Sequence, residues 1–112
     1  MNVVAYSGSK FTVELFGDGK NCPAAAFLNG LDVPTRAKAY ALFARLGDTG
    51  QIRNIEKFRH LEGSDKIFEF KPTRQVRLLC FFVPGRRVIA THGFIKKSAK
   101  TPRTEIDRAE SI

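Results

Sequence analysis

Apolar and polar residues alternate near the start of the chain, and this pattern predicts β-structure. The segment 11–15, FTVEL, has period-2 alternation, which is typical of a strand with one buried face. Residues 3–6 predict an earlier strand, joined to it by a turn over the small residues 7–9. Gly17, Asp18 and Gly19 end this part of the chain as a loop.

Helical spacing follows, and it predicts two helices over 23–29 and 33–46. Pro23 and Pro34 each suit a first helical turn, where the missing N–H would have no partner. Asp32 is a good N-cap for the second helix. Gly30 and Gly47 are the predicted ends. One face of the second helix is predicted to enter the core, through Tyr40, Phe43 and Leu46.

The rest of the chain predicts a meander of strands and a closing helix. Apolar residues recur every three positions over 52–61, which fits a short helical turn or an irregular packed segment. Strands are predicted over 67–71, 75–83 and 87–94, with Pro84 and Gly85 as a tight turn. The 75–83 strand is apolar on both faces and so belongs in the middle of the sheet. Thr101 is the predicted cap of a last helix that Pro102 opens.

These elements predict an α+β fold and one domain spanning residues 1–112. The hydrophobic share of 43% and the charged share of 27% are ordinary for a globular domain and argue against disorder. No apolar run reaches the ~18 residues that a membrane-spanning helix needs. The N-terminus shows no secretory signal pattern, so we expect a cytoplasmic protein without a membrane partner. Cys22 and Cys80 lie far apart, which argues against a disulfide scaffold or a zinc module.

The positive charge is concentrated in one third of the chain. The formal net charge is +8, and residues 71–103 contain no Asp or Glu. Nine basic residues lie there: Lys71, Arg74, Arg77, Arg86, Arg87, Lys96, Lys97, Lys100 and Arg103. A sheet would gather these charges on one surface, which favours a polyanion or an acidic protein as partner. The alternative is a basic surface that is simply solvated.

Arg77 is the most informative candidate for chemistry, because it lies in the middle of the apolar strand 75–83. A buried guanidinium is costly unless it is paired or faces a wet cleft. Arg77 is therefore either a structural partner of Glu69 on the neighbouring strand or the floor of an anion-binding cleft. Lys96 and Lys97 follow the next strand, and such cations could stabilise the extra charge of a phosphoryl transition state.

Histidines offer acid–base chemistry, whereas known cofactor motifs are missing. His60 and His92 could each act as a general base or acid, although a lone histidine is more often a hydrogen-bonded structural residue. The sequence has no glycine-rich phosphate loop, no HExxH and no acidic cluster with metal-ligand spacing. We therefore expect no metal, no nucleotide and no other small-molecule cofactor.

Several segments together resemble the phage-derived, HigB-like branch of the RelE/ParE toxin superfamily. They are KFRHLEG at 57–63, FEFK at 68–71, VRL at 76–78, THGFIKK at 91–97, KTP at 100–102 and EI at 105–106. Pro23 with Phe27 and Leu28 is similar to the first helix of that branch. The resemblance implies a RelE-like fold: an N-terminal strand and two helices packed on a small twisted, mainly antiparallel sheet, with a short C-terminal helix.

The resemblance also implies a function, a site and partners. It implies the toxin of a type II toxin–antitoxin system, an endoribonuclease that cuts mRNA in the ribosomal A site without a metal. Its partners would be the ribosome, mRNA and a helix-turn-helix, HigA-like antitoxin. By position, Arg77 would contact the scissile phosphate, with Lys71, Lys96, Lys97 and His92 as further catalytic candidates. The flanking basic residues would contact RNA: Lys57, Arg59, Arg74, Lys100 and Arg103.

The sequence departs from the RelE pattern at one point and leaves two other functions open. RelE-type sites often place a tyrosine near the C-terminus, but the tyrosines here are Tyr6 and Tyr40, so Phe94 or His92 would have to replace it. One alternative is a ParE-like inhibitor of DNA gyrase without a catalytic site. The other is a non-catalytic phage-derived protein that binds RNA or an acidic partner.

Overall fold

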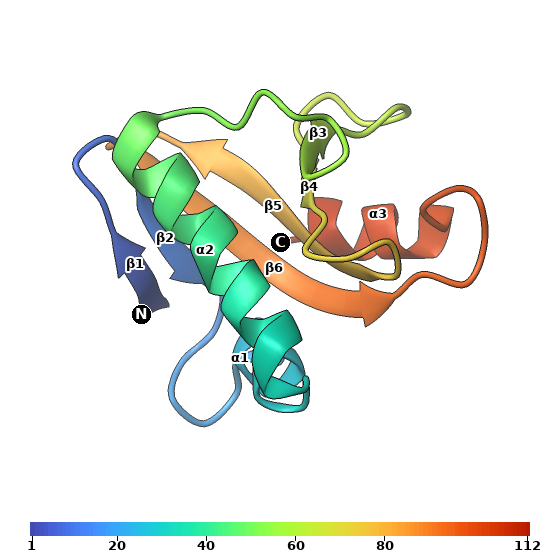
Figure 1. The fold of residues 1–112 in the computed structure, drawn as a ribbon, viewed down its shortest axis with the longest axis horizontal. Helices are drawn as coiled ribbons and strands as arrows, with labels where there is room; N and C mark the ends of the chain where they lie inside the picture. The colour runs from blue at the N-terminus through green and yellow to red at the C-terminus, as the bar shows by residue number, and fades with distance from the viewer.

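The computed structural model describes all residues, 1–112, and shows a six-stranded sheet with helices on both faces (Figure 1). The elements in chain order are β1 (Val3–Ser7), β2 (Thr12–Leu15), α1 (Pro23–Asn29), α2 (Val33–Thr49), β3 (Phe58–His60), β4 (Phe68–Phe70), β5 (Val76–Val83), β6 (Arg87–Ile95) and α3 (Arg103–Glu110). The strand order is β1-β2-β6-β5-β4-β3. Only β2 and β6 pair in parallel. The predicted α+β fold with a mainly antiparallel sheet is confirmed.

The sheet separates two apolar cores. Helices α1 and α2 pack on one face, where Phe43 and Leu28 meet Leu78 and Phe70. Helix α3 packs on the other face, through residues that include Ile106. Strand β5 lies between β6 and β4 and sends side chains into both cores, as its apolar pattern predicts. No helix combines the length and apolar character needed to cross a membrane.

The two N-terminal helices begin where predicted, but α2 ends one turn later. The Asp32 side chain accepts a hydrogen bond from the Thr35 N–H, as an N-cap should. The helix continues to Thr49, and Gly50, with φ of 82°, ends it in the left-handed conformation. Gly47, the predicted end, lies inside the helix because β1 and its turn pass close by: a β-carbon there would lie 2.8 Å from the Tyr6 ring. Of the three predicted core residues, Phe43 and Leu46 are buried but Tyr40 is exposed.

The segment between α2 and β4 is mostly irregular and contains the short strand β3. Ile52, Phe58 and Leu61 are buried, as the three-residue spacing predicts, but Ile55 is 71% exposed. Strand β3 pairs antiparallel with β4 and places Arg59 directly opposite Glu69. The sheet edge thereby brings a second basic residue beside Glu69, the carboxylate that the sequence paired with Arg77.

The start of the last helix differs from the prediction. Thr101 does not cap α3: Pro102 holds the N-cap position and no side chain bonds the first turn. The Thr101 hydroxyl instead donates a hydrogen bond to Oε2 of Glu69, at 2.6 Å. The reason is tertiary, since docking α3 on the sheet places Thr101 above β4.

Candidate functional site

Arg77 is paired with Glu69, as one of the two alternatives predicts, and it also lies at the wall of a cavity. The residue is 6% exposed and is the second of the eight residues of β5. Nη1 donates to Oε1 of Glu69 at 2.9 Å, and Nη2 donates to the backbone oxygen of Arg74 at 2.6 Å. Nε is buried and has no hydrogen-bond partner. Arg77 also lines two cavities, and a guanidinium held at a cavity wall is a natural contact for an anion.

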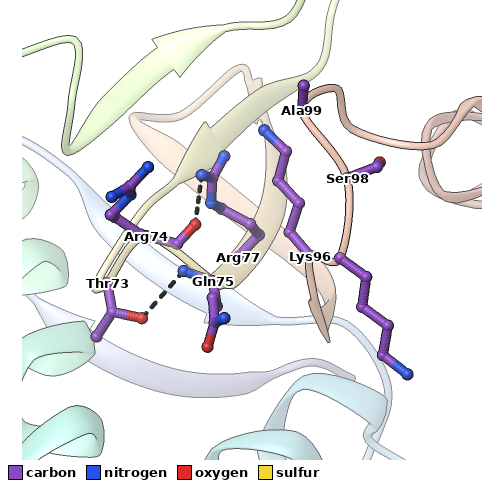
Figure 2. Close-up of a pocket in the computed structure, with 8 residues that line it drawn as sticks. Thr73, Arg74, Gln75, Arg77, Lys96, Ser98 and Ala99 are labelled. Carbon is purple, nitrogen blue, oxygen red and sulfur yellow. Dashed lines mark hydrogen bonds between the residues drawn. The ribbon is translucent and has the colours of Figure 1, made fainter.

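Two adjoining cavities meet at Arg77 and form a basic groove. One, of about 490 Å³, is lined by Thr73, Arg74, Gln75, Arg77, Lys96, Lys97, Ser98 and Ala99. The other, of about 450 Å³, is lined by Glu56, Lys57, Lys71, Thr73, Arg74 and Arg77. We call these two cavities together the basic groove. Figure 2 shows Arg74, Arg77 and Lys96 gathered at the first cavity, with Arg74 before β5 and Lys96 just after β6.

A third cavity adjoins the basic groove at Ala99. It has a volume of about 240 Å³ and is lined by Arg59, Leu61, Glu62, Ala99, Lys100, Thr101 and Ile106. It lies under the segment that leads from β6 into α3. Two of the predicted RNA contacts, Arg59 and Lys100, are therefore beside the groove rather than in it.

The groove concentrates positive charge around a single buried carboxylate. Glu69 is fully buried, and Arg77 and Arg59 both lie within 4 Å of it, Arg59 through Nε at 3.6 Å. Burial lowers the pKa of Lys96, and the charge of Arg77 lowers it further. Burial also lowers the pKa of Lys71, with Arg59 and Arg77 adding to the effect. The cations thus repel one another, and an anion in the groove would relieve that repulsion.

The lowered pKa values also have a chemical consequence. An ammonium group that loses its proton more readily is better matched to acid–base work near neutral pH. Lys71 and Lys96 lie on either side of Arg77, one lining each cavity. The groove can therefore bind a phosphate and stabilise added negative charge on it. No group of three or more His, Cys, Asp or Glu side chains comes together as a metal site.

Most of the predicted catalytic and RNA-binding residues come together in the groove. Six of them line it: Lys57, Lys71, Arg74, Arg77, Lys96 and Lys97. Sequence reasoning missed the polar lining residues Thr73, Gln75 and Ser98. Their only signal was their position immediately before β5 and after β6, beside the basic residues.

His92 lies outside the basic groove. Its ring is hydrogen-bonded on both sides, which fits the structural alternative given for this residue. Its side chain is 1% exposed and lines none of the three cavities around Arg77. Nδ1 lies 2.9 Å from the Thr91 hydroxyl, and Nε2 lies 2.9 Å from Oε1 of Glu105 on α3. Both ring nitrogens therefore have partners, and the contact of Nε2 with Glu105 holds α3 to β6.

Arg103 is also placed apart from the groove, against its predicted contact with RNA. Its guanidinium pairs with Asp107 at 2.9 Å and with Glu110 at 3.2 Å, and it donates to the backbone oxygen of Gly63. The contact with Gly63 holds α3 against the turn before β4, whereas the two ion pairs lie within the helix. The predicted stacking substitute Phe94, by contrast, is the cross-strand partner of Arg77 in the β5–β6 register.

Comparison with known proteins adds one finding. The sequence model of a family described as "Phage derived protein Gp49-like (DUF891)" matches residues 26–112. The matched part includes α2, strands β3 to β6, α3 and therefore every residue of the basic groove. No curated protein matches the chain.

Proposed function

The chain belongs to the Gp49-like family of phage-derived proteins, a family of the RelE-type toxin group, and on that premise we propose that it is a toxin that cuts mRNA on the ribosome. The observation that carries the proposal is the basic groove. It places a buried, oriented arginine between two lysines whose pKa values are lowered. Such an arrangement supports the proposal because it can bind a phosphate and stabilise the charge that develops on it in the transition state.

The proposed reaction is attack of a ribose 2′-oxygen on the adjacent phosphorus atom. The 2′-O–P bond forms while the P–O5′ bond breaks, which leaves a cyclic 2′,3′-phosphate and a 5′-hydroxyl. Arg77 contacts the non-bridging oxygens and stabilises their added charge in the transition state. Lys71 and Lys96, one in each cavity, take the proton from the 2′-oxygen and give one to the departing 5′-oxygen.

The remaining groove residues hold the RNA strand. Lys57 and Lys97 each line one cavity and Arg74 lines both, and these side chains would contact the neighbouring phosphates. Phe94, opposite Arg77 in the register, is the proposed stacking partner for a base. The ribosome would present the mRNA to the groove in the cytoplasm, and an antitoxin encoded beside the toxin would cover the groove with acidic side chains.

The test is a reconstituted translation reaction with mapping of the mRNA 5′ ends. We compare wild type with Arg77→Gln and with the control Arg86→Gln, which removes the same charge from an exposed residue in the β5–β6 turn. New 5′ ends that need ribosomes, persist in Arg86→Gln and disappear in Arg77→Gln are the expected result.

Two outcomes would overturn the proposal. Intact message with normal translation would exclude the nuclease, and a supercoiling assay would then test the gyrase alternative. Cleavage by Arg77→Gln at the wild-type rate would keep the activity but place its site outside the basic groove.

A further inference from the structure

Glu69 joins three parts of the molecule through one fully buried carboxylate. Oε1 accepts a hydrogen bond from Arg77 on β5, and Nε of Arg59 on β3 lies 3.6 Å away. Oε2 accepts the hydrogen bond of the Thr101 hydroxyl, just before α3. The residue lines neither cavity of the basic groove, so its contact with the groove is indirect.

The contact with Glu69 fixes the plane of the Arg77 guanidinium. Nη1 is held by the carboxylate, and Nη2 is held from the other side by the backbone oxygen of Arg74. A rotation about the side chain would break one of these two bonds. The guanidinium of Arg77, a residue that lines both cavities, therefore keeps one orientation.

The contact with Thr101 fixes a wall of the groove. Residues 96–101 connect β6 to α3, and Lys96, Lys97, Ser98 and Ala99 of this segment line the first cavity (Figure 2). One end is tied down because the Lys96 N–H donates to the Gln75 oxygen at 2.6 Å. The other end is tied through the Thr101–Glu69 bond, at 2.6 Å. Glu69 thus orients both the arginine and the lysine-bearing segment that faces it.

We propose that Glu69, acting with Thr101, is a positioning residue that sets the geometry between Arg77 and the 96–101 segment for cleavage. The inference rests on the proposed function. The proposed role predicts opposite effects of Glu69 on RNA binding and on the cleavage rate, because a buried carboxylate opposes the attraction of an RNA strand to the groove. Misplacing a catalytic group by about 1 Å can cost 100-fold in rate. The structure thus retains a negative charge that weakens RNA binding and holds the reacting groups in place.

The discriminating variant is Glu69→Gln, which keeps the side-chain shape and removes the charge. We expect the maximal cleavage rate on programmed ribosomes to fall about 10- to 100-fold. The protein concentration for half-maximal cleavage is expected to stay unchanged or to fall, since the groove becomes more positive. The control Asp65→Asn removes the same charge from an exposed residue before β4 and is expected to behave as wild type.

A second pair of variants tests the Thr101 contact with little risk to folding. Thr101→Val removes the hydroxyl and keeps the shape, and Thr101→Ser keeps the hydroxyl. We expect Thr101→Val to lower the maximal rate and Thr101→Ser to retain it. Equal rates for Val and Ser, or a wild-type rate for Glu69→Gln, would overturn the inference.

A physical readout separates this inference from the proposed function. In ¹⁵N NMR spectra, slow rotation of the Arg77 guanidinium gives separate Nη signals, and we expect Glu69→Gln to merge them. If wild type cuts no RNA, the proposed function fails, but these signals still test whether Glu69 holds Arg77. Unchanged Arg77 signals in Glu69→Gln would refute the positioning role whatever the activity.

Discussion

Arg77 belongs to the candidate site, and replacing it with methionine tests whether it also stabilises the fold. Methionine keeps an unbranched side chain of similar reach and loses the charge and the donors. The fully buried Glu69 then loses the partner at 2.9 Å. We expect the variant to be less stable than wild type at pH 7, because a buried carboxylate is left with weaker partners.

The magnitude follows from what remains around Glu69. Removing one partner of a fully buried ion pair costs about 3–5 kcal/mol. Here Arg59 stays at 3.6 Å and the Thr101 hydroxyl at 2.6 Å, so we place the loss lower, at about 2–3 kcal/mol. That is roughly a 30- to 150-fold change in the unfolding equilibrium. A domain with a typical stability of about 5–15 kcal/mol would remain folded.

The assay is urea unfolding followed by far-ultraviolet circular dichroism. The double variant Arg77→Met with Glu69→Gln is measured beside the single one, and Arg86→Met is the control at an exposed arginine. We expect the double variant to recover about 1–2 kcal/mol of the loss, since no unpaired buried charge remains. Added salt is expected to change the difference little, because a buried pair is weakly screened.

Two results would refute this reasoning. If Arg77→Met unfolds within about 0.5 kcal/mol of wild type, the pair does not stabilise the fold. If the double variant recovers nothing, the loss comes from packing and not from the stranded carboxylate. The first result would also mean that loss of cleavage in an Arg77 variant reports catalysis and not unfolding.

Three further predictions concern other parts of the molecule. Lys96→Gln is expected to lower cleavage but to raise stability by about 0.5 kcal/mol at pH 7. This gain should disappear as the pH rises through the lowered folded pKa and past 10.5, above which the wild-type lysine is neutral in both states. Burial lowers the pKa of His92 in the folded protein below its ordinary value of 6.5. Wild type should therefore lose stability as the pH falls from 6.5 through the lower folded pKa, because the unfolded chain takes up the proton first. The His92→Gln variant should lose less stability over this range and should still cut RNA. Gly93→Ala should lose about 1–3 kcal/mol, because its methyl group would overlap the Phe27 ring, whereas Gly19→Ala has open space.

Each of these has a result that would contradict it. A Lys96→Gln variant that is less stable than wild type would show that the repulsion from Arg77 is not felt by the fold. Parallel stability curves for wild type and His92→Gln between pH 7 and 5 would show that His92 does not titrate on unfolding there. Equal urea midpoints for the two alanine variants would show that α1 can move away from β6.

Much of the fold could be predicted because it depends on neighbours in the sequence. Pro23 and Asp32 mark helix starts through backbone chemistry that acts within one turn. The apolar run of β5 predicts a central strand because both of its faces must be buried. The end of α2 was misjudged at Gly47, since a glycine needed for close packing against Tyr6 looks the same in sequence as one that ends a helix.

The candidate site could be predicted only in part, because its residues come from segments that are distant in the sequence. The sequence by itself determined that the positive charge lies in residues 71–103 and that an arginine interrupts an apolar strand. Tertiary structure decided which of these cations share a groove, because strand register sets Arg59 opposite Glu69 and the hairpin brings Lys96 to Arg77. Tertiary structure also decided that His92 and Arg103 contact residues of α3, and that the Thr101 hydroxyl donates to Glu69. Side-chain pairing between distant segments depends on register and helix docking, which local sequence patterns do not specify.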